Sequence, residues 1–286
     1  MANDCRFAVL IDADNVSVKY IKIILDEISK DGIATYKRIY GDWTNPSLIS
    51  WKSALLDNSI IPIQQYSYTT GKNSTDSAMI IDAMDILYSG KVEGFCLVSS
   101  DSDFTRLAAR LRESGMTVIG MGESKTPNSF IASCNKFKYL DILSAADEEE
   151  PEDAQKPELS KKALQQKKSP SRKTASQKKA KDEPKTEKEP KASDTKKQQK
   201  DIEEPRTSLR TIRRALRTIV RENSDEDNWI IIGKVGNILG KRYPDFDVRN
   251  FGFSKLTPFL DSLDMFEIKS ERKDSNSSPQ MYVRLK

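Results

Sequence analysis

The sequence predicts an α/β protein: a large domain on a mostly parallel sheet, a disordered linker, and a small winged-helix domain of the α+β type. Strand-like and helix-like patterns alternate regularly near the N-terminus, and a long stretch without aromatic residues follows. Helical patterns and two alternating strand patterns then close the chain. We therefore place the first domain at 1–146, the linker at 147–206 and the second domain at 207–286.

The first domain contains five segments that predict strands, at 7–11, 34–40, 60–63, 94–98 and 116–121; the runs that lead to Asp12 and Asp101 are continuous and apolar. The segments between them predict helices at 16–30, after Asn45-Pro46, at 74–88 and at 103–114. Asn favours the cap of a helix and Pro its first turn, which supports the second of these helices. Since strands and helices alternate, the sheet is expected to be mostly parallel with helices on both faces.

The predicted linker is rich in Lys, Glu, Ser, Gln and Pro, and no aromatic residue occurs from Leu140 to Asn228. Such a segment buries too little apolar surface to offset its ordering entropy, so we expect disorder. Two roles stay open for it. One is a solubilising tether, and the other is a lysine-rich arm at 161–200 that contacts phosphates.

The second domain begins with an amphipathic pattern at 209–220, whose polar face carries five arginines, Arg210, Arg213, Arg214, Arg217 and Arg221. Further helices are expected at Gly233–Leu239 and after Asp247, which suits a helix cap. Alternating patterns at 265–269 and 281–285 predict a β-hairpin around a polar turn. Helices followed by a hairpin in a segment of this length are typical of a winged helix.

Two residue types limit the chemistry. The chain has no histidine, which excludes Ser-His-Asp and Cys-His catalysis, His-ligated zinc and ribonucleases that use paired imidazoles. Its three cysteines, Cys5, Cys96 and Cys134, are widely spaced and match neither a disulfide framework nor a zinc site. No signal peptide or membrane-spanning stretch is evident, so we expect a cytoplasmic protein with reduced thiols and no membrane partner.

The charge is unevenly distributed, although the whole chain carries only +4. Residues 1–146 hold 15 basic and 17 acidic side chains, a net charge of −2. Residues 207–286 hold 15 basic and 11 acidic ones, a net charge of +4. This asymmetry suggests a nucleic acid that the C-terminal part holds and the N-terminal part processes.

Acidic residues follow two of the predicted strands: Asp12 and Asp14 come after the first, and Asp101 and Asp103 after the fourth. The carboxyl ends of parallel strands meet at the edge of the sheet where α/β proteins bind ligands. Because clustered acids repel one another, a hard cation such as Mg²⁺ or Mn²⁺ is the usual reason for such a group. A cation held in this way can lower the pKa of a bound water and shield phosphate charge.

Asp76 is expected in the first turn of the helix at 74–88 and joins this group, together with the Asn15 amide as a contact to phosphate or to a metal-bound water. Simpler roles stay open: Asn15 and Asp103 also suit helix caps, and Asp14 could point away. Asp82 lies six residues after Asp76, roughly 240° around the helix, so the two do not share a face.

Three segments resemble the NYN family, whose members are related to PIN-domain nucleases; they lie at 10–16, 76–82 and 98–104, and the match covers roughly 5–143. The resemblance implies a PIN-like three-layer fold and a Mg²⁺- or Mn²⁺-dependent ribonuclease. It places the family's acids at Asp12, Asp76, Asp82, Asp101 and Asp103 and its amide at Asn15. The resemblance therefore implies that Asp82 belongs to the site, although the helical spacing alone argues against it. Ser100 stands where the family often has Gly and could contact a phosphate or fill the turn. Related nucleases often form dimers, which leaves a homodimer open.

The C-terminal segment resembles the OST-HTH, or LOTUS, domain over about 207–286. The matching residues are Trp229, 232–236, 243–247 and 249–256. This resemblance implies that the segment binds RNA or a protein partner. The residues themselves offer a positive surface for a nucleic-acid backbone, formed by Lys234, Lys241, Arg242, Arg249 and Lys255. Trp229, Phe246, Phe251 and Phe253 are expected mainly in the core.

Three functions are therefore open from the sequence. The first is a ribonuclease in which Asp12, Asp76, Asp101 and Asp103 hold one or two metal ions and a tethered domain supplies RNA. The second is a non-catalytic RNA-binding scaffold on a degenerate nuclease fold. The third is a haloacid-dehalogenase-like phosphatase with Asp12 as nucleophile and Asp14 as acid.

Overall fold

The computed structural model describes residues 5–66, 74–148, 207–272 and 279–286. The predicted linker falls almost wholly outside these residues, apart from the end of helix α6 (Leu140–Glu148). Contacts group the described residues of the N-terminal and C-terminal parts into one compact unit.

A six-stranded sheet forms the centre of the N-terminal domain, with the strands in the order β3-β2-β1-β4-β5-β6. All neighbouring strands are parallel, as predicted. Their bounds are Arg6–Asp12 (β1), Ile33–Gly41 (β2), Ile61–Gln64 (β3), Gly94–Val98 (β4), Thr117–Gly122 (β5) and Lys136–Tyr139 (β6). The first five confirm the predicted strands, whereas β6 was not predicted.

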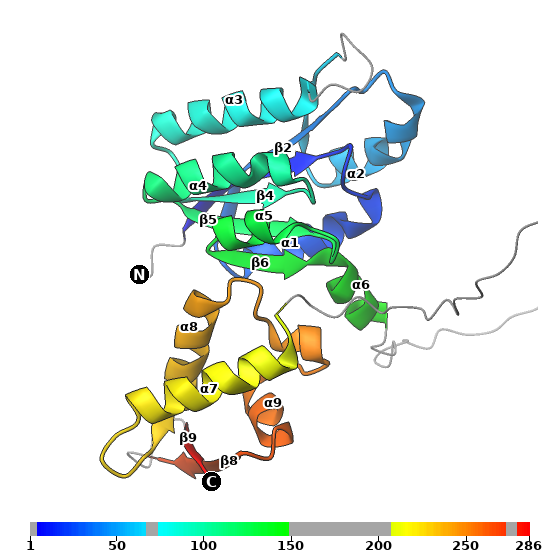
Figure 1. Ribbon diagram of the computed structural model, residues 1–286. Coiled ribbons are helices and arrows are strands. Elements are labelled where there is room, and N and C mark those ends of the chain that lie inside the picture. Colours follow the sequence, from blue (N-terminus) through cyan, green and yellow to red (C-terminus); the bar gives the residue numbers. More distant parts are fainter. Residues whose placement is uncertain (1–4, 67–73, 149–206, 273–278) are drawn as a thin grey trace, which may run out of the picture. The chain divides into compact units, whose positions relative to one another are not determined.

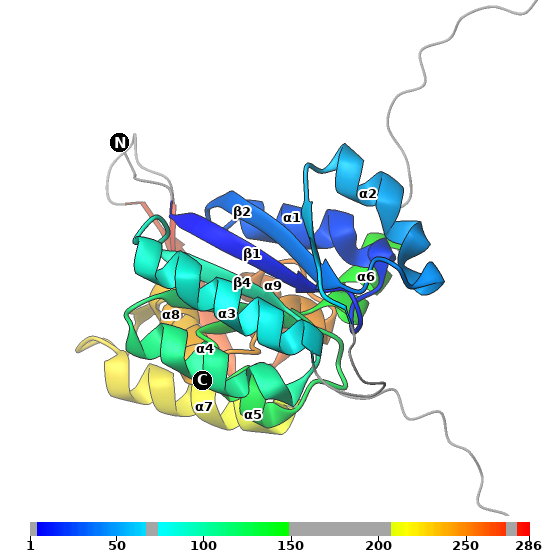
Figure 2. The same cartoon turned by 90° about the horizontal axis from the view of Figure 1, so that it is seen from above.

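Helices cover both faces of this sheet, which gives the predicted three layers. On one face lie α1 (Ile21–Ser29), α2 (Trp51–Asp57) and α6; on the other lie α3 (Ser74–Ser89), α4 (Thr105–Glu113) and α5 (Asn128–Ser133). Two short 3₁₀ helices, η1 (Val18–Tyr20) and η2 (Pro46–Ser50), precede α1 and α2. The Asn45 side chain caps η2, as predicted, by accepting a hydrogen bond from the Ser47 amide. Figures 1 and 2 show α3 and α4 side by side along the sheet.

The central strands are apolar without interruption because both of their faces are covered. Residues 8–11 of β1 and 95–98 of β4 are all 0 % exposed. Alternate residues of β1 enter opposite cores: Val9 and Ile11 pack with α1, whereas Ala8 and Leu10 pack with α3 and α4. Burying a side chain of this kind contributes roughly 1.5–3 kcal/mol. This burial fixes the strand ends that carry the acidic residues.

The C-terminal domain contains three α-helices among the described residues and a small antiparallel sheet in the order β7-β9-β8. The helices are α7 (Leu209–Asn223), α8 (Ile232–Arg242) and α9 (Leu256–Ser262), and the strands are β7 (Ile230–Ile231), β8 (Phe266–Glu271) and β9 (Gln280–Leu285). The apolar face of α7 lies in the core of this domain. The arrangement confirms the predicted helices followed by a hairpin.

One predicted helix of this domain is wrong in its extent. The single helix expected after Asp247 is a 3₁₀ helix, η4 (Val248–Phe251), followed by α9. Gly252 separates them with φ of 78°, a left-handed conformation that glycine adopts without steric cost. The break directs Phe246, Phe251 and Phe253 onto the ring of Phe259, so these rings belong to the core as predicted.

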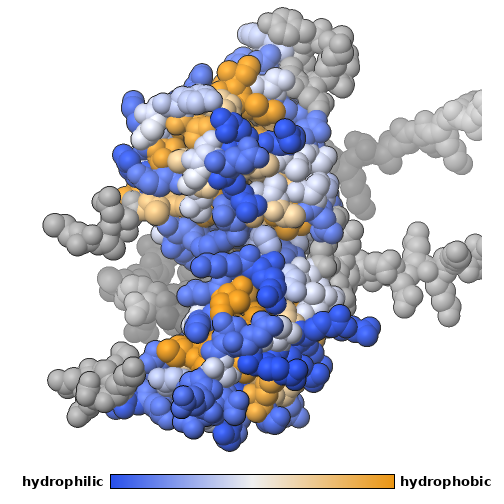
Figure 3. Space-filling model, turned by 60° about the vertical axis from the view of Figure 1, so that its left-hand side comes forward, coloured by the Kyte–Doolittle hydropathy of each residue, from blue (hydrophilic) through white to orange (hydrophobic). Residues whose placement is uncertain are grey.

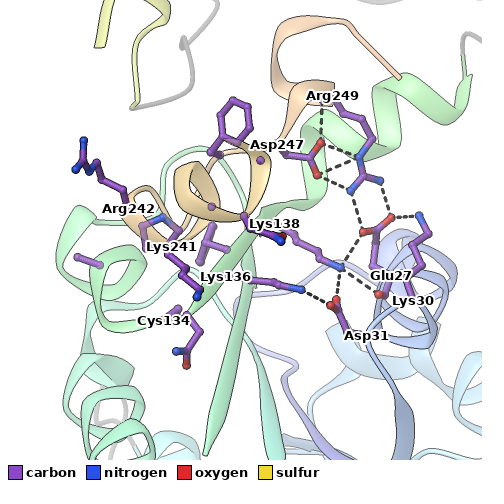
Figure 4. A pocket seen from close by; sticks show the side chains of 18 of the residues that line it. Glu27, Lys30, Asp31, Cys134, Lys136, Lys138, Lys241, Arg242, Asp247 and Arg249 are labelled. Atoms are coloured by element: carbon purple, nitrogen blue, oxygen red, sulfur yellow. Dashed lines mark hydrogen bonds and ion pairs between the residues drawn. The ribbon is translucent and has the colours of Figure 1, made fainter. Parts of the chain in front are cut away.

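The C-terminal domain contacts the outer edge of β6. The Phe137 amide donates to the Pro244 carbonyl at 2.7 Å, and the Arg249 guanidinium donates to both Glu27 oxygens at 2.6 and 2.9 Å. Figure 4 shows Arg249 between Asp247 and Glu27. The bond to Pro244 satisfies the Phe137 amide, a backbone donor that an edge strand otherwise leaves without a partner.

No helix among the described residues combines the length and apolar character needed to cross a bilayer. On the face seen in Figure 3, hydrophobic side chains form separate patches among hydrophilic ones.

Candidate active site

Three carboxylates converge beyond the carboxyl end of the sheet. Oxygen atoms of Asp76, Asp101 and Asp103 all lie within 4.8 Å of one another. Asp76 comes from the first turn of α3, Asp101 follows β4, and Asp103 lies in the 3₁₀ helix η3 (Ser102–Phe104). The structure therefore brings together three of the five acids that the sequence predicted as metal ligands.

Local hydrogen bonds hold the loop that carries two of these acids. The Asp101 side chain caps η3 by accepting from the Asp103 amide at 2.9 Å. The Asp101 amide in turn donates to Ser99 Oγ at 3.1 Å. The capping residue is thus Asp101, whereas the sequence left a capping role open for Asp103. The Asp101 carboxylate therefore orders the loop and also belongs to the acidic cluster.

Asp12, the last residue of β1, is 0 % exposed. Its carboxylate accepts hydrogen bonds from the Asp14 amide at 3.1 Å, from Asn15 Nδ2 at 2.7 Å and from Ser99 Oγ at 2.8 Å. Asn15 therefore orients Asp12 and does not cap a helix. Ser99 was not singled out from the sequence. The parallel register of β1 and β4, which pairs Ile11 with Val98, places Ser99 beside Asp12.

The electrostatics of the cluster favour a bound cation. The pKa of Asp76 is raised to about 6, first by burial and then by the negative charges of Asp12, Asp101, Asp103 and Asp14, in that order. Burial also raises the pKa of Asp12, against the lowering effect of its hydrogen bonds. Ionising all these groups together is unfavourable without a counter-charge. Carboxylate oxygens are the ligands that Mg²⁺ and Mn²⁺ prefer, so the donor set fits such an ion.

Asp82 lies on α3 but outside this cluster. It forms an ion pair with Arg38 and accepts a hydrogen bond from the Tyr40 hydroxyl, both residues of β2. Burial and the neighbouring Asp82 raise the pKa of Tyr40. These contacts join α3 to the sheet and place Asp82 on a different face of the helix from Asp76.

Ser100 fills the turn after β4. It is 9 % exposed, and its hydroxyl accepts a hydrogen bond from the Glu123 amide at 2.9 Å. A Cβ atom at Gly122 would lie 2.6 Å from the Ser99 carbonyl and 3.0 Å from Ser100 Oγ. Gly122 therefore allows the ends of β4 and β5 to approach closely beneath the acidic loop.

The predicted nucleic-acid contacts of the C-terminal domain fall into two groups. Lys234, Lys241, Arg242 and Lys255 are exposed. Arg249 instead forms ion pairs with Glu27 and Asp247, and the hydrogen bond to Glu27 raises the pKa of its guanidinium. Most of its donors are thus engaged within the protein.

Comparison with known proteins identifies both domains. Residues 6–141 match the NYN domain family, and residues 206–277 match the OST-HTH/LOTUS domain family. These matches support a nuclease joined to an RNA-binding domain. No curated protein matches the chain.

Two solved structures resemble parts of the chain. A protein of unknown function from Vibrio parahaemolyticus has 17% sequence identity and a TM-score of 0.42; the similarity covers 49% of this chain and 94% of that one. An uncharacterized protein from Nitrosomonas europaea has 27% identity and a TM-score of 0.25; the similarity covers 32% of this chain and 89% of that one.

Proposed function

We propose that this chain, in which an OST-HTH/LOTUS domain follows an NYN domain, is a Mg²⁺- or Mn²⁺-dependent ribonuclease that hydrolyses RNA phosphodiester bonds. The observation that carries the proposal is the convergence of Asp76, Asp101 and Asp103 within 4.8 Å. The absence of histidine in the chain leaves carboxylates as the natural groups for this chemistry.

In this proposal, Asp76, Asp101 and Asp103 hold the cation. When bound, the ion offsets phosphate charge and makes water easier to deprotonate. The chain's own residues position these ligands: the Ser99 hydroxyl donates to the Asp12 carboxylate and accepts from the Asp101 amide, which connects the end of β1 to the acidic loop. Asn15 keeps Asp12 oriented from the other side. The exposed basic residues of the OST-HTH domain hold the RNA.

Two alternatives make different predictions. A non-catalytic scaffold would bind RNA with unchanged affinity after Asp101→Asn, and neither form would cleave it. A phosphatase would need Asp12 as an accessible nucleophile. The complete burial of Asp12 and its three hydrogen bonds do not favour that role. A protein partner of the OST-HTH domain, a homodimer and a cytoplasmic location stay predictions.

The test is cleavage of labelled single-stranded RNA by the full chain in Mn²⁺, Mg²⁺ or EDTA. We expect cleavage in either metal, none in EDTA, and a loss of at least about 100-fold in Asp101→Asn/Asp103→Asn, because two ligand charges are gone. Asparagine retains the oxygen that caps η3, so the loop is expected to keep its fold.

Asp85→Asn is the matched control, since Asp85 is exposed on the same helix as Asp76 and lies outside the cluster. It should cleave RNA like the wild type. RNA binding without cleavage by the wild type in any of these metals would contradict the proposal and favour the scaffold.

A further inference from the structure

One face of α7 carries a stripe of five arginines. The stripe consists of Arg210, Arg213, Arg214, Arg217 and Arg221, all of them exposed. At 3.6 residues per turn they lie within an arc of about 100°, over about 16 Å of helix. The opposite face supplies Ile212, Leu216 and Ile219 to the core. The stripe is thus held rigidly by a buried helix.

Four cations of this domain are paired with carboxylates, whereas the arginines of the stripe, like Lys234, Lys241, Arg242 and Lys255, form no ion pair within the described residues. Arg249, Lys269, Arg284 and Lys286 each form an ion pair with a carboxylate. No carboxylate of the described residues forms an ion pair with any arginine of the stripe. Its guanidinium groups therefore keep their charge and donors available for a ligand.

The surface along the stripe is hollowed. One groove is lined by all five arginines with Leu209 and Thr218. A second groove shares Arg210, Arg214 and Thr218 with the first and adds Arg242 from the end of α8. Arg242 was among the nucleic-acid contacts predicted from the sequence, and here it extends the stripe beyond α7.

We propose that this arginine stripe, extended by Arg242, is the surface on which the OST-HTH domain binds the phosphate backbone of single-stranded RNA. This inference rests on the proposed function and assigns its RNA contacts to α7. A row of cations at helical spacing matches a polyanion with regularly repeated charge, and arginine binds phosphate through two parallel hydrogen bonds. Contacts of this kind position the backbone without reading the bases.

The test compares two full-length triple variants that lose equal charge. The stripe variant is Arg213→Gln/Arg217→Gln/Arg221→Gln. The matched control is Lys22→Gln/Lys52→Gln/Lys91→Gln, which removes three exposed cations of the N-terminal domain. Binding of a labelled single-stranded RNA is measured by fluorescence anisotropy across a salt series. EDTA is present throughout, so the result does not depend on whether the acidic cluster cleaves RNA.

We expect the stripe variant to bind RNA at least about tenfold more weakly at 0.1 M salt. Its plot of log K against log salt should be shallower by roughly 2, since each lost contact to a single strand removes about 0.7. The control should stay within about twofold of the wild type. Replacing the same three arginines by lysine should restore most of the salt dependence, because the charge returns.

Three results would overturn the inference: no RNA binding by the wild type, equal weakening in both triple variants, or an unchanged stripe variant. Poly-L-glutamate provides a further comparison. If it displaced RNA at equal charge concentration, the stripe would be a site for acidic protein segments instead. Circular dichroism of each variant confirms that α7 is intact, which a substitution of Arg by Gln at exposed helix positions should preserve.

Discussion

At the scale of single residues, the acidic cluster stores unfavourable electrostatic energy in the metal-free protein. The pKa of Asp76 is raised to about 6, first by burial and then by four neighbouring carboxylates. An acid whose pKa is raised by folding binds protons more tightly in the folded state, so the folded state loses stability as pH rises toward 6. Above that pH the full repulsion is present. This repulsion is relieved when a cation binds to the cluster or when a neutral side chain replaces one of its carboxylates.

We therefore expect Asp101→Asn/Asp103→Asn to be more stable than the wild type in EDTA at pH 7.5. The gain should be on the order of 1 kcal/mol, because the groups lie partly in solvent, which corresponds to a melting temperature higher by roughly 2–4 °C. Millimolar Mn²⁺ should stabilise the wild type and leave the variant unchanged. Thermal unfolding with and without Mn²⁺ measures both effects.

A variant less stable than the wild type, together with no Mn²⁺ effect on the wild type, would contradict this account of the cluster. Asp85→Asn serves again as the control and should respond to Mn²⁺ like the wild type.

The sequence could predict that Asp76, Asp101 and Asp103 meet, because parallel strands end at one edge and helix starts face that edge. It could not show which acids already have partners. Asp82 bonds to Arg38 and Tyr40, which lie about 40 positions earlier in the chain. Asp12 bonds to Ser99, 87 residues away. Such pairings depend on the order of the strands in the sheet, which the pattern of residues along the chain does not reveal.

At the scale of elements, β6 illustrates why one strand escaped prediction. Its residues alternate between lysine and aromatic side chains, and Lys136 and Lys138 do not suit a buried strand by themselves. In the fold, Lys138 pairs with Glu27 and Asp31, and Lys136 pairs with Asp31. These carboxylates lie more than 100 positions earlier. The strands predicted at 7–11 and 94–98, in contrast, are continuous apolar runs that are buried by neighbouring strands and helices.

Repulsion between the arginines of α7 should offset part of the stability that the helix gains by burying its apolar face, because like charges three and four residues apart repel. The stripe variant, Arg213→Gln/Arg217→Gln/Arg221→Gln, removes four such pairs. We expect it to be more stable than the wild type by about 1 kcal/mol at 20 mM salt. At 500 mM salt the difference should nearly vanish, since screening weakens repulsion between exposed charges. Urea denaturation at the two salt concentrations measures this.

A stripe variant that is less stable at both salt concentrations would show that the arginines support the fold. The same three positions changed to lysine should behave like the wild type, because they keep the charge.

At the scale of the whole molecule, the described parts of the two domains are joined by charged groups with little exposure. The Glu27 side chain is 4% exposed and contacts Arg249, Lys138 and Lys30. Burial alone would raise the pKa of Glu27, but hydrogen bonds from Arg249 and Lys30 and the charge of Lys138 together hold it far below its usual value. Asp245 adds a second contact by accepting hydrogen bonds from Tyr139 at 3.2 Å and from Thr207. These contacts differ from the freely tethered C-terminal domain that the sequence suggested.

The pair Glu27–Arg249 should therefore couple the stabilities of the two domains. We expect a double-mutant cycle of Glu27→Gln and Arg249→Met to give a coupling energy of about 2 kcal/mol or more at pH 7, as partly buried charge pairs do. The exposed pair Glu267–Arg284, with side chains 50% and 40% exposed, should give less than about 1 kcal/mol in the same cycle.

The coupling should also depend on pH. Because folding lowers the pKa of Glu27, its ionised carboxyl stabilises the folded state above its unfolded pKa of 4.5, and this stability is lost as the pH falls below that value. The Glu27 coupling should accordingly persist from pH 7 to pH 5 and decline toward pH 3, as calorimetric unfolding of the full chain can measure. Equal coupling in both pairs, or no pH dependence, would mean that the contact between Glu27 of α1 and Arg249 does not couple the two domains.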